Sequence, residues 1–144
     1  MNVNIIVLGK LKEAYFKQAS AEYEKRLLAY CKLRITELEP DRRGSLEAEA
    51  VHINAKMPKS YKIALCAEGE RLASESFADR LLKARSDISF IIGSSEGLAE
   101  SVKQSADLKL SLSDMTFPYQ LARIMLMEQI YRAFSINNNG KYHK

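Results

Sequence analysis

The stretch Ile88-Ser-Phe-Ile-Ile-Gly-Ser-Ser-Glu-Gly-Leu98 decides the fold, because a strand-like run ends in it and opens into a small polar loop. The apolar run 88–92 predicts a buried strand, which stops at Gly93. A second strand-like run, 108–112, breaks in the same way into Ser113-Asp-Met-Thr-Phe-Pro118. In open α/β sheets, ligands bind in the crevice at the carboxyl ends of the strands. The two loops therefore predict a ligand-binding crevice.

Strands and helices alternate along the rest of the chain. The continuous apolar run 3–8 predicts a strand buried on both faces, and alternating residues predict a strand nearer the edge at 32–38. A shorter apolar run predicts a strand at 62–67, and helical patterns cover 12–30, 45–57, 74–85, 99–105 and 118–134. This alternation predicts an α/β fold with a mostly parallel sheet flanked by helices. We expect one domain over 1–144.

The composition of the 144 residues, 47% hydrophobic and 28% charged, is typical of a soluble globular protein. A net charge of +4 permits a polyanionic partner without requiring one. Cys31 and Cys66 form no CxxC motif, so the sequence indicates neither a disulfide framework nor a metal site. No run approaches the roughly 18 apolar residues of a membrane span, and the N-terminus lacks the basic start of a signal peptide. We therefore expect a cytoplasmic protein.

Each crevice loop has two possible interpretations. Gly93 would let a ligand approach the backbone and Gly97 could adopt a positive φ, but glycines are also common in ordinary strand-to-helix turns. The loop matches neither GxGxxG nor GxxxxGK[ST]. In the second loop, main-chain groups without ladder partners could pair with a flat heterocycle such as adenine. Alternatively, Ser113 or Asp114 caps the following helix.

The predicted helix 118–134 has apolar residues on nearly every side. One side can meet the sheet, and another is expected to meet a second copy of the chain. Arg123 lies among apolar residues of this helix and needs a partner, which could be a carboxylate, a phosphate or a base edge. A structural ion pair and a substrate role both remain open for it. Glu128 and Arg132 are spaced for a solvent-side ion pair.

The C-terminal tail, 140–144, combines the general-base candidate His143 with the aromatic Tyr142 and two lysines. RNA-binding surfaces use such mixtures, with cations for phosphate and aromatic rings for stacking. The alternative is a frayed and inert terminus. His52, inside the predicted helix 45–57, is expected to be a surface or packing residue.

Ordered motifs along nearly the whole chain resemble the RlmH family of SPOUT-type methyltransferases. The matching segments are Val7–Lys12, Glu22–Leu27, Ile91–Leu98, Leu110–Pro118, Arg123, Glu128–Phe134 and Tyr142–Lys144. The resemblance implies an α/β-knot fold with a trefoil knot in the C-terminal part. It also implies S-adenosylmethionine as the methyl donor, a homodimer with composite active sites, and methylation of N3 of a pseudouridine in 23S ribosomal RNA.

Motif matching carries the cofactor contacts of that family to Leu65, Gly93, Leu112, Ser113, Asp114, Met115, Thr116 and Phe117. Two positions depart from the family pattern: Ser94 replaces a common glycine, and Tyr119 replaces a histidine. The first adds a side chain beside the cofactor loop. The second puts a catalytic role for that position in doubt.

The expected chemistry requires a base, because N3 of a uracil-like ring must lose a proton before or during attack. His143 is the candidate base, with Tyr142 stacking on or orienting the ring and Arg123 stabilising its anionic form. Rival interpretations are a knot methyltransferase acting on another RNA nucleotide, a non-catalytic ribosome- or RNA-binding module, and a nucleotide-binding regulatory domain. Missing phosphate motifs count against the last. The small net charge favours a preformed surface of the large subunit or ribosome over free RNA.

Overall fold

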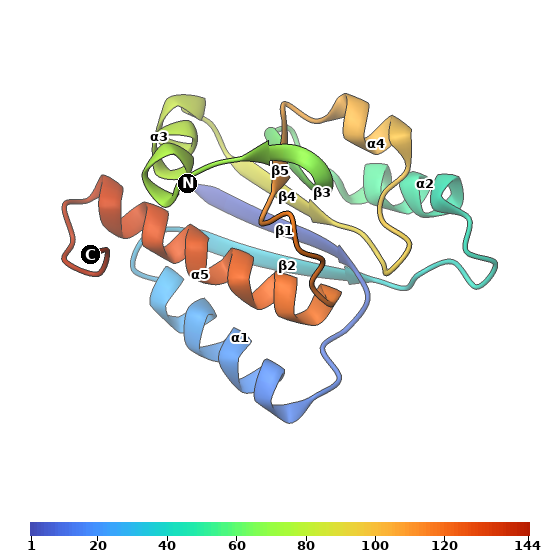
Figure 1. Cartoon of the computed structure of the whole chain (residues 1–144), viewed down its shortest axis with the longest axis horizontal. Coiled ribbons are helices and arrows are strands. Elements are labelled where there is room, and N and C mark those ends of the chain that lie inside the picture. Colours follow the sequence, from blue (N-terminus) through green and yellow to red (C-terminus); the bar gives the residue numbers. More distant parts are fainter.

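A computed structural model describes all residues, 1–144, and contains ten helices and strands that alternate without exception (Figure 1). In chain order they are β1 (Asn2–Leu8), α1 (Ala14–Leu27), β2 (Lys32–Leu38), α2 (Leu46–Lys56), β3 (Tyr61–Arg71), α3 (Ser74–Ala84), β4 (Ile88–Ile92), α4 (Glu100–Ser105), β5 (Leu108–Ser111) and α5 (Tyr119–Asn137). Every element predicted from the sequence is present. Ser45 caps α2, since its side chain accepts the N–H of Ala48.

The five strands form one parallel sheet in the order β2-β1-β4-β3-β5. The predicted α/β class with a parallel sheet is therefore confirmed. Strand β2 lies at the edge, as its alternating pattern indicated. Strand β4, at the centre, is buried at every residue, in agreement with its uninterrupted apolar run.

Helices cover both faces of the sheet. One face packs against α1, α3 and α5, and its core includes Phe90, Leu126 and Ile130. The other face packs against α2 and α4, where Ile53 and Val102 contact Ile91 and its neighbours. Figure 1 shows α5 lying along the sheet with α1 beside it. None of the helices is both long and apolar enough to cross a lipid bilayer.

Strand β3 is longer than the sequence indicated. The polar run after residue 67 predicted its end, but the strand continues to Arg71 because it leaves and rejoins its neighbour β5. Leu65 and Glu70 both pair with Leu110, so residues 66–69 bulge out of the ladder. This bulge forms one wall of the crevice described next. Helix α1 is shorter than predicted at both ends, and α5 extends three residues further, to Asn137.

Candidate active site

A cavity of about 380 Å³ lies at the carboxyl ends of β4 and β5 and at the bulge of β3, beside the first turn of α5. We call it the crevice. All eight residues expected to contact the cofactor line it: Leu65, Gly93, Leu112, Ser113, Asp114, Met115, Thr116 and Phe117. The structure therefore brings together residues that are up to 52 positions apart in the sequence, because parallel strands all end at one edge of the sheet.

The crevice loop 93–98 closes tightly on itself. A Cβ atom at Gly93 would lie 2.3 Å from the carbonyl oxygen of Gly97, so only glycine fits there. Gly97 has φ of 88°, as expected, and its N–H donates to the carbonyl of Ser94 at 2.9 Å. The loop itself therefore requires Gly93, which supports the interpretation as a strand-to-helix turn at this position.

The main chain of the second loop, 112–117, bonds to side chains at two points only, and one of them is the Ser113 carbonyl, which accepts the Ser111 hydroxyl at 2.9 Å. No backbone–backbone hydrogen bond involves these residues, and the Ser113 hydroxyl accepts the N–H of Met115 at 3.0 Å. The alternative, in which Ser113 or Asp114 caps the following helix, is wrong. The N-cap residue of α5 is Pro118, and no side chain caps this helix. Asp114 instead forms an ion pair with Arg71 from the end of β3.

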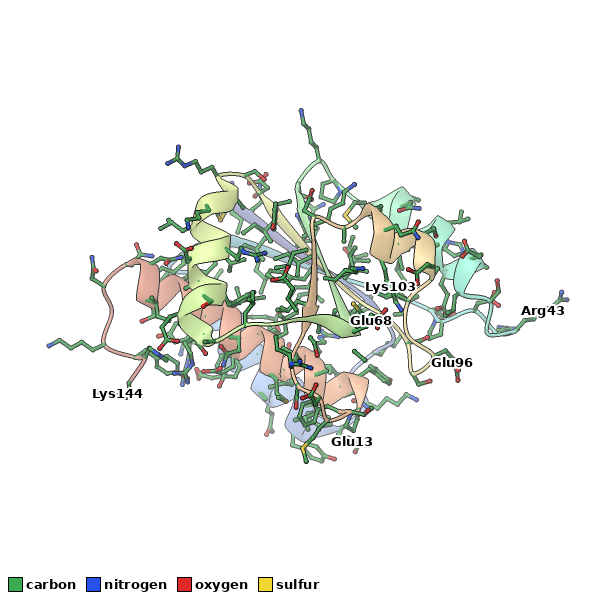
Figure 2. All side chains as sticks on the ribbon, turned by 45° about the horizontal axis from the view of Figure 1, so that its top comes forward. Glu13, Arg43, Glu68, Glu96, Lys103 and Lys144 are labelled. Atoms are coloured by element: carbon green, nitrogen blue, oxygen red, sulfur yellow. The ribbon has the colours of Figure 1, made fainter.

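Sequence patterns gave no signal for the wall formed by the β3 bulge and α4. Lys103 forms a 2.6 Å ion pair with Glu68, and Figure 2 shows the two side chains meeting beside the crevice. The hydrogen bond between them raises the pKa of Lys103 and lowers the pKa of Glu68. Cys66 lies on the same wall, where burial raises the pKa of its thiol. These residues reach the crevice because β3 bulges at 66–69. The polar run in this part of the sequence gives no sign that the strand continues, so their position could not be predicted.

Tyr119, at the family's histidine position, makes a structural contact. Its ring packs against Gly9, where an added Cβ would lie 2.9 Å from the ring carbon Cε2. Its hydroxyl donates to the carbonyl of Lys10 at 3.1 Å. Tyr119 therefore holds the segment after β1 against the start of α5, at the rim of the crevice.

Arg123 is buried and does not line the crevice. Only 6% of its side chain is exposed, and its Nη1 atom lies 2.6 Å from the Glu37 carboxylate on β2. Its Nε atom has no hydrogen-bond partner. Of the two roles considered for Arg123, this contact supports the structural ion pair. A role of Arg123 at the substrate stays a prediction.

The C-terminal tail is packed, not frayed. It lies on Glu128 and Arg132, which form the expected ion pair at 2.7 Å. The expected solvent exposure of that pair is wrong, because Tyr142 covers it: its hydroxyl donates to Glu128 at 3.1 Å and its ring centroid is 4.8 Å from the Arg132 guanidinium. The tail thus binds the middle of α5, roughly 14 Å along the helix axis from Tyr119 at the crevice.

His143 is held between two side chains of the same chain. Its Nδ1 atom lies 3.0 Å from Nη1 of Arg132, and its Nε2 atom lies 2.7 Å from the Glu75 carboxylate. Since arginine can only donate, Nδ1 is the acceptor and Nε2 carries the proton given to Glu75. In this tautomer only Nδ1 can accept a further proton, so its contact with Arg132 has to open before His143 acts as a base. His52 is exposed on α2, as expected for a surface residue.

Comparison with known proteins gives full-length matches. A family model described as "Predicted SPOUT methyltransferase" matches residues 1–143. The chain is 45% identical to the ribosomal RNA large subunit methyltransferase H of Bacillus pumilus and 44% identical to that of Clostridioides difficile. It is 42% identical to the Fusobacterium nucleatum protein of the same name. Each match covers 100% of both chains.

Two solved structures share the fold at low sequence identity. A probable methylase family protein from Haemophilus influenzae has a TM-score of 0.59 at 14% identity, covering 99% of this chain and 70% of that one. The tRNA (m1G37) methyltransferase of Aquifex aeolicus has a TM-score of 0.57 at 16% identity, covering 92% and 70%. With these likenesses, the α/β-knot fold class predicted from the sequence is confirmed.

Proposed function

Because the chain belongs to the SPOUT methyltransferase family, we propose that it methylates N3 of a pseudouridine in 23S ribosomal RNA, with S-adenosylmethionine as donor. Membership makes it a methyltransferase. Its relatives in three bacteria, at 42–45% identity over full length, are named for the RNA of the large ribosomal subunit. The observation that carries the proposal is the single crevice lined by all eight expected cofactor residues. We propose one methyltransferase domain spanning 1–144.

The residues of the crevice fit S-adenosylmethionine. The volume of about 380 Å³ falls in the range of roughly 300–1,000 Å³ for small-molecule sites. The loop 112–117 forms no backbone–backbone hydrogen bond, so its remaining main-chain groups offer donors and acceptors for adenine. Among the carboxylates that line the crevice, Glu68 and Asp114 are in ion pairs, whereas Glu96 is in none and is available to a cationic ligand.

The chemistry needs a proton acceptor beside the target base. S-adenosylmethionine carries its methyl group on a positively charged sulfur and so supplies the electrophile. In our proposal His143 removes the N3 proton and Tyr142 stacks on the ring. For Arg123, stabilisation of the anionic ring stays a prediction, since Glu37 already pairs with its guanidinium.

A homodimer would reconcile the tail with the crevice. Within one protomer the tail binds the middle of α5 and not the crevice. An apolar cavity of about 500 Å³, lined by Leu72, Ile124 and Met125 among others, lies beside the crevice and shares Leu112 with it. Such an apolar hollow supports docking of a second copy. We propose that the tail of one protomer completes the crevice of its partner.

Two measurements test the activity. Calorimetry with the purified protein should detect binding of S-adenosylmethionine. In a strain that lacks the gene, mass spectrometry should show that the ribosomal RNA no longer contains one methylated pseudouridine. We expect the large subunit or the whole ribosome in the cytoplasm to be the substrate. Retention of that nucleotide together with loss of a methyl group elsewhere would assign another RNA target. Absence of cofactor binding would favour a non-catalytic binding module.

A mixing experiment tests the composite site. Ala122→Trp places a large ring in the crevice from helix α5, and His143→Ala removes the candidate base; each homodimer should be inactive. Random exchange makes half of the dimers mixed, each with one intact crevice facing one intact tail, so about a quarter of the wild-type activity should return. If crevice and tail act within one chain, mixing restores nothing. Analytical ultracentrifugation establishes that each variant is dimeric.

A further inference from the structure

We propose that the loop 39–45, which carries Arg42 and Arg43, binds the phosphate backbone of the RNA substrate beside the crevice. We call it the arginine loop. This inference rests on the proposed function for its substrate and adds a binding site to it. None of the residues that line the crevice belongs to the arginine loop, so the two surfaces are separate.

The backbone of the arginine loop is held in one conformation. The Asp41 carboxylate accepts the N–H groups of Arg43 at 3.0 Å and Ser45 at 2.9 Å. The N–H of Gly44 donates to the Asp41 carbonyl at 3.0 Å. A loop that is already ordered loses little conformational entropy when it binds, so its side chains are presented ready for a ligand.

Both arginines of the loop are free to bind. They are exposed, and neither belongs to an ion pair, whereas Arg71 and Arg123 are each paired with a carboxylate. The loop also carries the carboxylates Glu39 and Asp41, but neither forms an ion pair with these arginines, and the Asp41 carboxylate accepts main-chain N–H groups instead. Guanidinium groups bind phosphate oxygens in a bidentate manner, which makes arginine well suited to a nucleic-acid backbone.

A buried carboxylate joins the arginine loop to the crevice loop. Glu49 on α2 is 3% exposed, and its Oε2 atom accepts the N–H of Asp41 at 2.8 Å. Its Oε1 atom accepts the hydroxyl of Ser94 at 3.4 Å, in the loop that follows β4. Glu49 therefore holds the arginine loop firmly and the crevice loop through a longer contact, which makes it a positioning residue. Ser94, the departure from the family glycine, supplies the second contact.

The position of the loop fits an RNA held across the crevice. The loop follows β2, so it lies at the same carboxyl end of the parallel sheet as the loops after β4 and β5, and β2 is two positions from β4 in the strand order. Figure 2 shows Arg43 extending into solvent at the end of the molecule where Glu96 lies, and Lys144 at the opposite end. A nucleotide whose base enters the crevice continues into flanking phosphates, and the arginines stand beside that path.

The test compares two double variants with the same change in charge. Arg42→Ala/Arg43→Ala removes the two cations before α2. Lys56→Ala/Lys59→Ala removes two exposed, unpaired cations, one at the other end of the same helix and one three residues beyond it. Methylation of purified ribosomes is measured at several salt concentrations, and binding of S-adenosylmethionine is measured by calorimetry. The wild-type rate on ribosomes is the reference for both.

The arginine variant should raise KM for ribosomes about tenfold and reduce the slope of log kcat/KM against log salt by about one to two. Its kcat and cofactor affinity should match wild type, and the lysine variant should change KM less than about twofold. An unchanged KM or salt slope overturns the inference while leaving the proposed function standing. A raised KM with an unchanged slope indicates a protein contact and also overturns it. If the wild-type protein does not methylate ribosomes, both the proposed function and the inference about the arginine loop are wrong.

Glu49 gives a second test that leaves the arginines in place. Glu49→Ala should raise KM with the same loss of salt slope, because the loop is no longer held. Glu49→Gln keeps an oxygen for the Asp41 N–H and should restore both values towards wild type. If Glu49→Ala keeps the wild-type KM and slope, Glu49 does not position the loop.

Discussion

The hydroxyl of Tyr142 donates a hydrogen bond of 3.1 Å to the carboxylate of Glu128, which joins the end of the chain to the middle of α5. The same carboxylate accepts two N–H groups of Arg132. Glu128 is thus shared between a helical ion pair and the tail. The tail can reach a crevice in two ways. Either it breaks this contact and moves, or it stays in place and a second protomer docks with its crevice against it.

Replacing Tyr142 by phenylalanine tests how firmly the tail is held. Burial and the hydrogen bond to Glu128 raise the pKa of the Tyr142 phenol, so folding favours the neutral form. This contribution is complete below pH 10 and is lost as the pH rises above it. Tyr142→Phe should lower the free energy of unfolding at pH 7 by about 1 kcal/mol. It should also remove a late-titrating phenol from the ultraviolet absorbance titration.

Tyr15→Phe is the matched control, because that ring is 63% exposed and its hydroxyl forms no hydrogen bond within the chain. It should leave the free energy of unfolding unchanged. Equal effects of the two substitutions would mean that Tyr142 is not held by Glu128.

The contact between Arg123 and Glu37 predicts a stability effect at neutral pH. Glu37→Gln removes the charge facing a guanidinium that is 6% exposed, so we expect the free energy of unfolding to fall by about 2 kcal/mol. Glu39→Gln, on the exposed residue two positions later, should change it by less than about 0.5 kcal/mol. Urea unfolding followed by circular dichroism gives both values. A Glu37→Gln protein as stable as wild type but catalytically impaired would favour the substrate role of Arg123.

The alternation of elements could be predicted from local features of the sequence. The apolar run 88–92 has the length of a strand and stops at a glycine, whereas 118–134 is too long for a strand and begins with a proline. The extension of β3 could not be predicted, since Glu68, Gly69 and Glu70 are polar and only the pairing with β5 makes them part of a strand. Tertiary pairing overrides the propensity of the segment there.

The crevice was predictable in part for a similar reason. Loops that follow parallel strands meet at one edge, so Gly93 and Met115 could be placed together without coordinates. Contacts between distant segments could not be placed: the pairing of Glu49 with Ser94 and of Lys103 with Glu68 depends on how two helices dock. The partner of Arg123 remained open because a wheel projection gives the side of a helix but not its neighbour.

Gly93 and Gly44 give a matched pair of glycine substitutions. A Cβ at Gly93 would lie 2.3 Å from the carbonyl oxygen of Gly97. A Cβ at Gly44 would have no atom within 4 Å, but the backbone of Gly44 has a φ of 72°. Gly44→Ala should therefore cost about 1 kcal/mol of backbone strain. Gly93→Ala should cost about 2–3 kcal/mol through the clash, and should weaken binding of S-adenosylmethionine. Thermal unfolding and calorimetry measure the two effects, and equal losses would contradict a closed loop.

The two cysteines report on the crevice through their reactivity. The thiolate is the reactive form, and burial raises the pKa of both thiols, that of Cys31 from 9.0 to about 11. The stability that neutral Cys31 contributes is complete below pH 9 and lost as the pH rises through 11. At pH 8, iodoacetamide should therefore modify Cys66 slowly, and Cys31 only after unfolding. Because Cys66 lines the crevice, saturating S-adenosylmethionine should slow its modification at least about tenfold, as measured by peptide mass spectrometry. An unchanged rate at Cys66, with binding established by calorimetry, would move the cofactor to a different cavity.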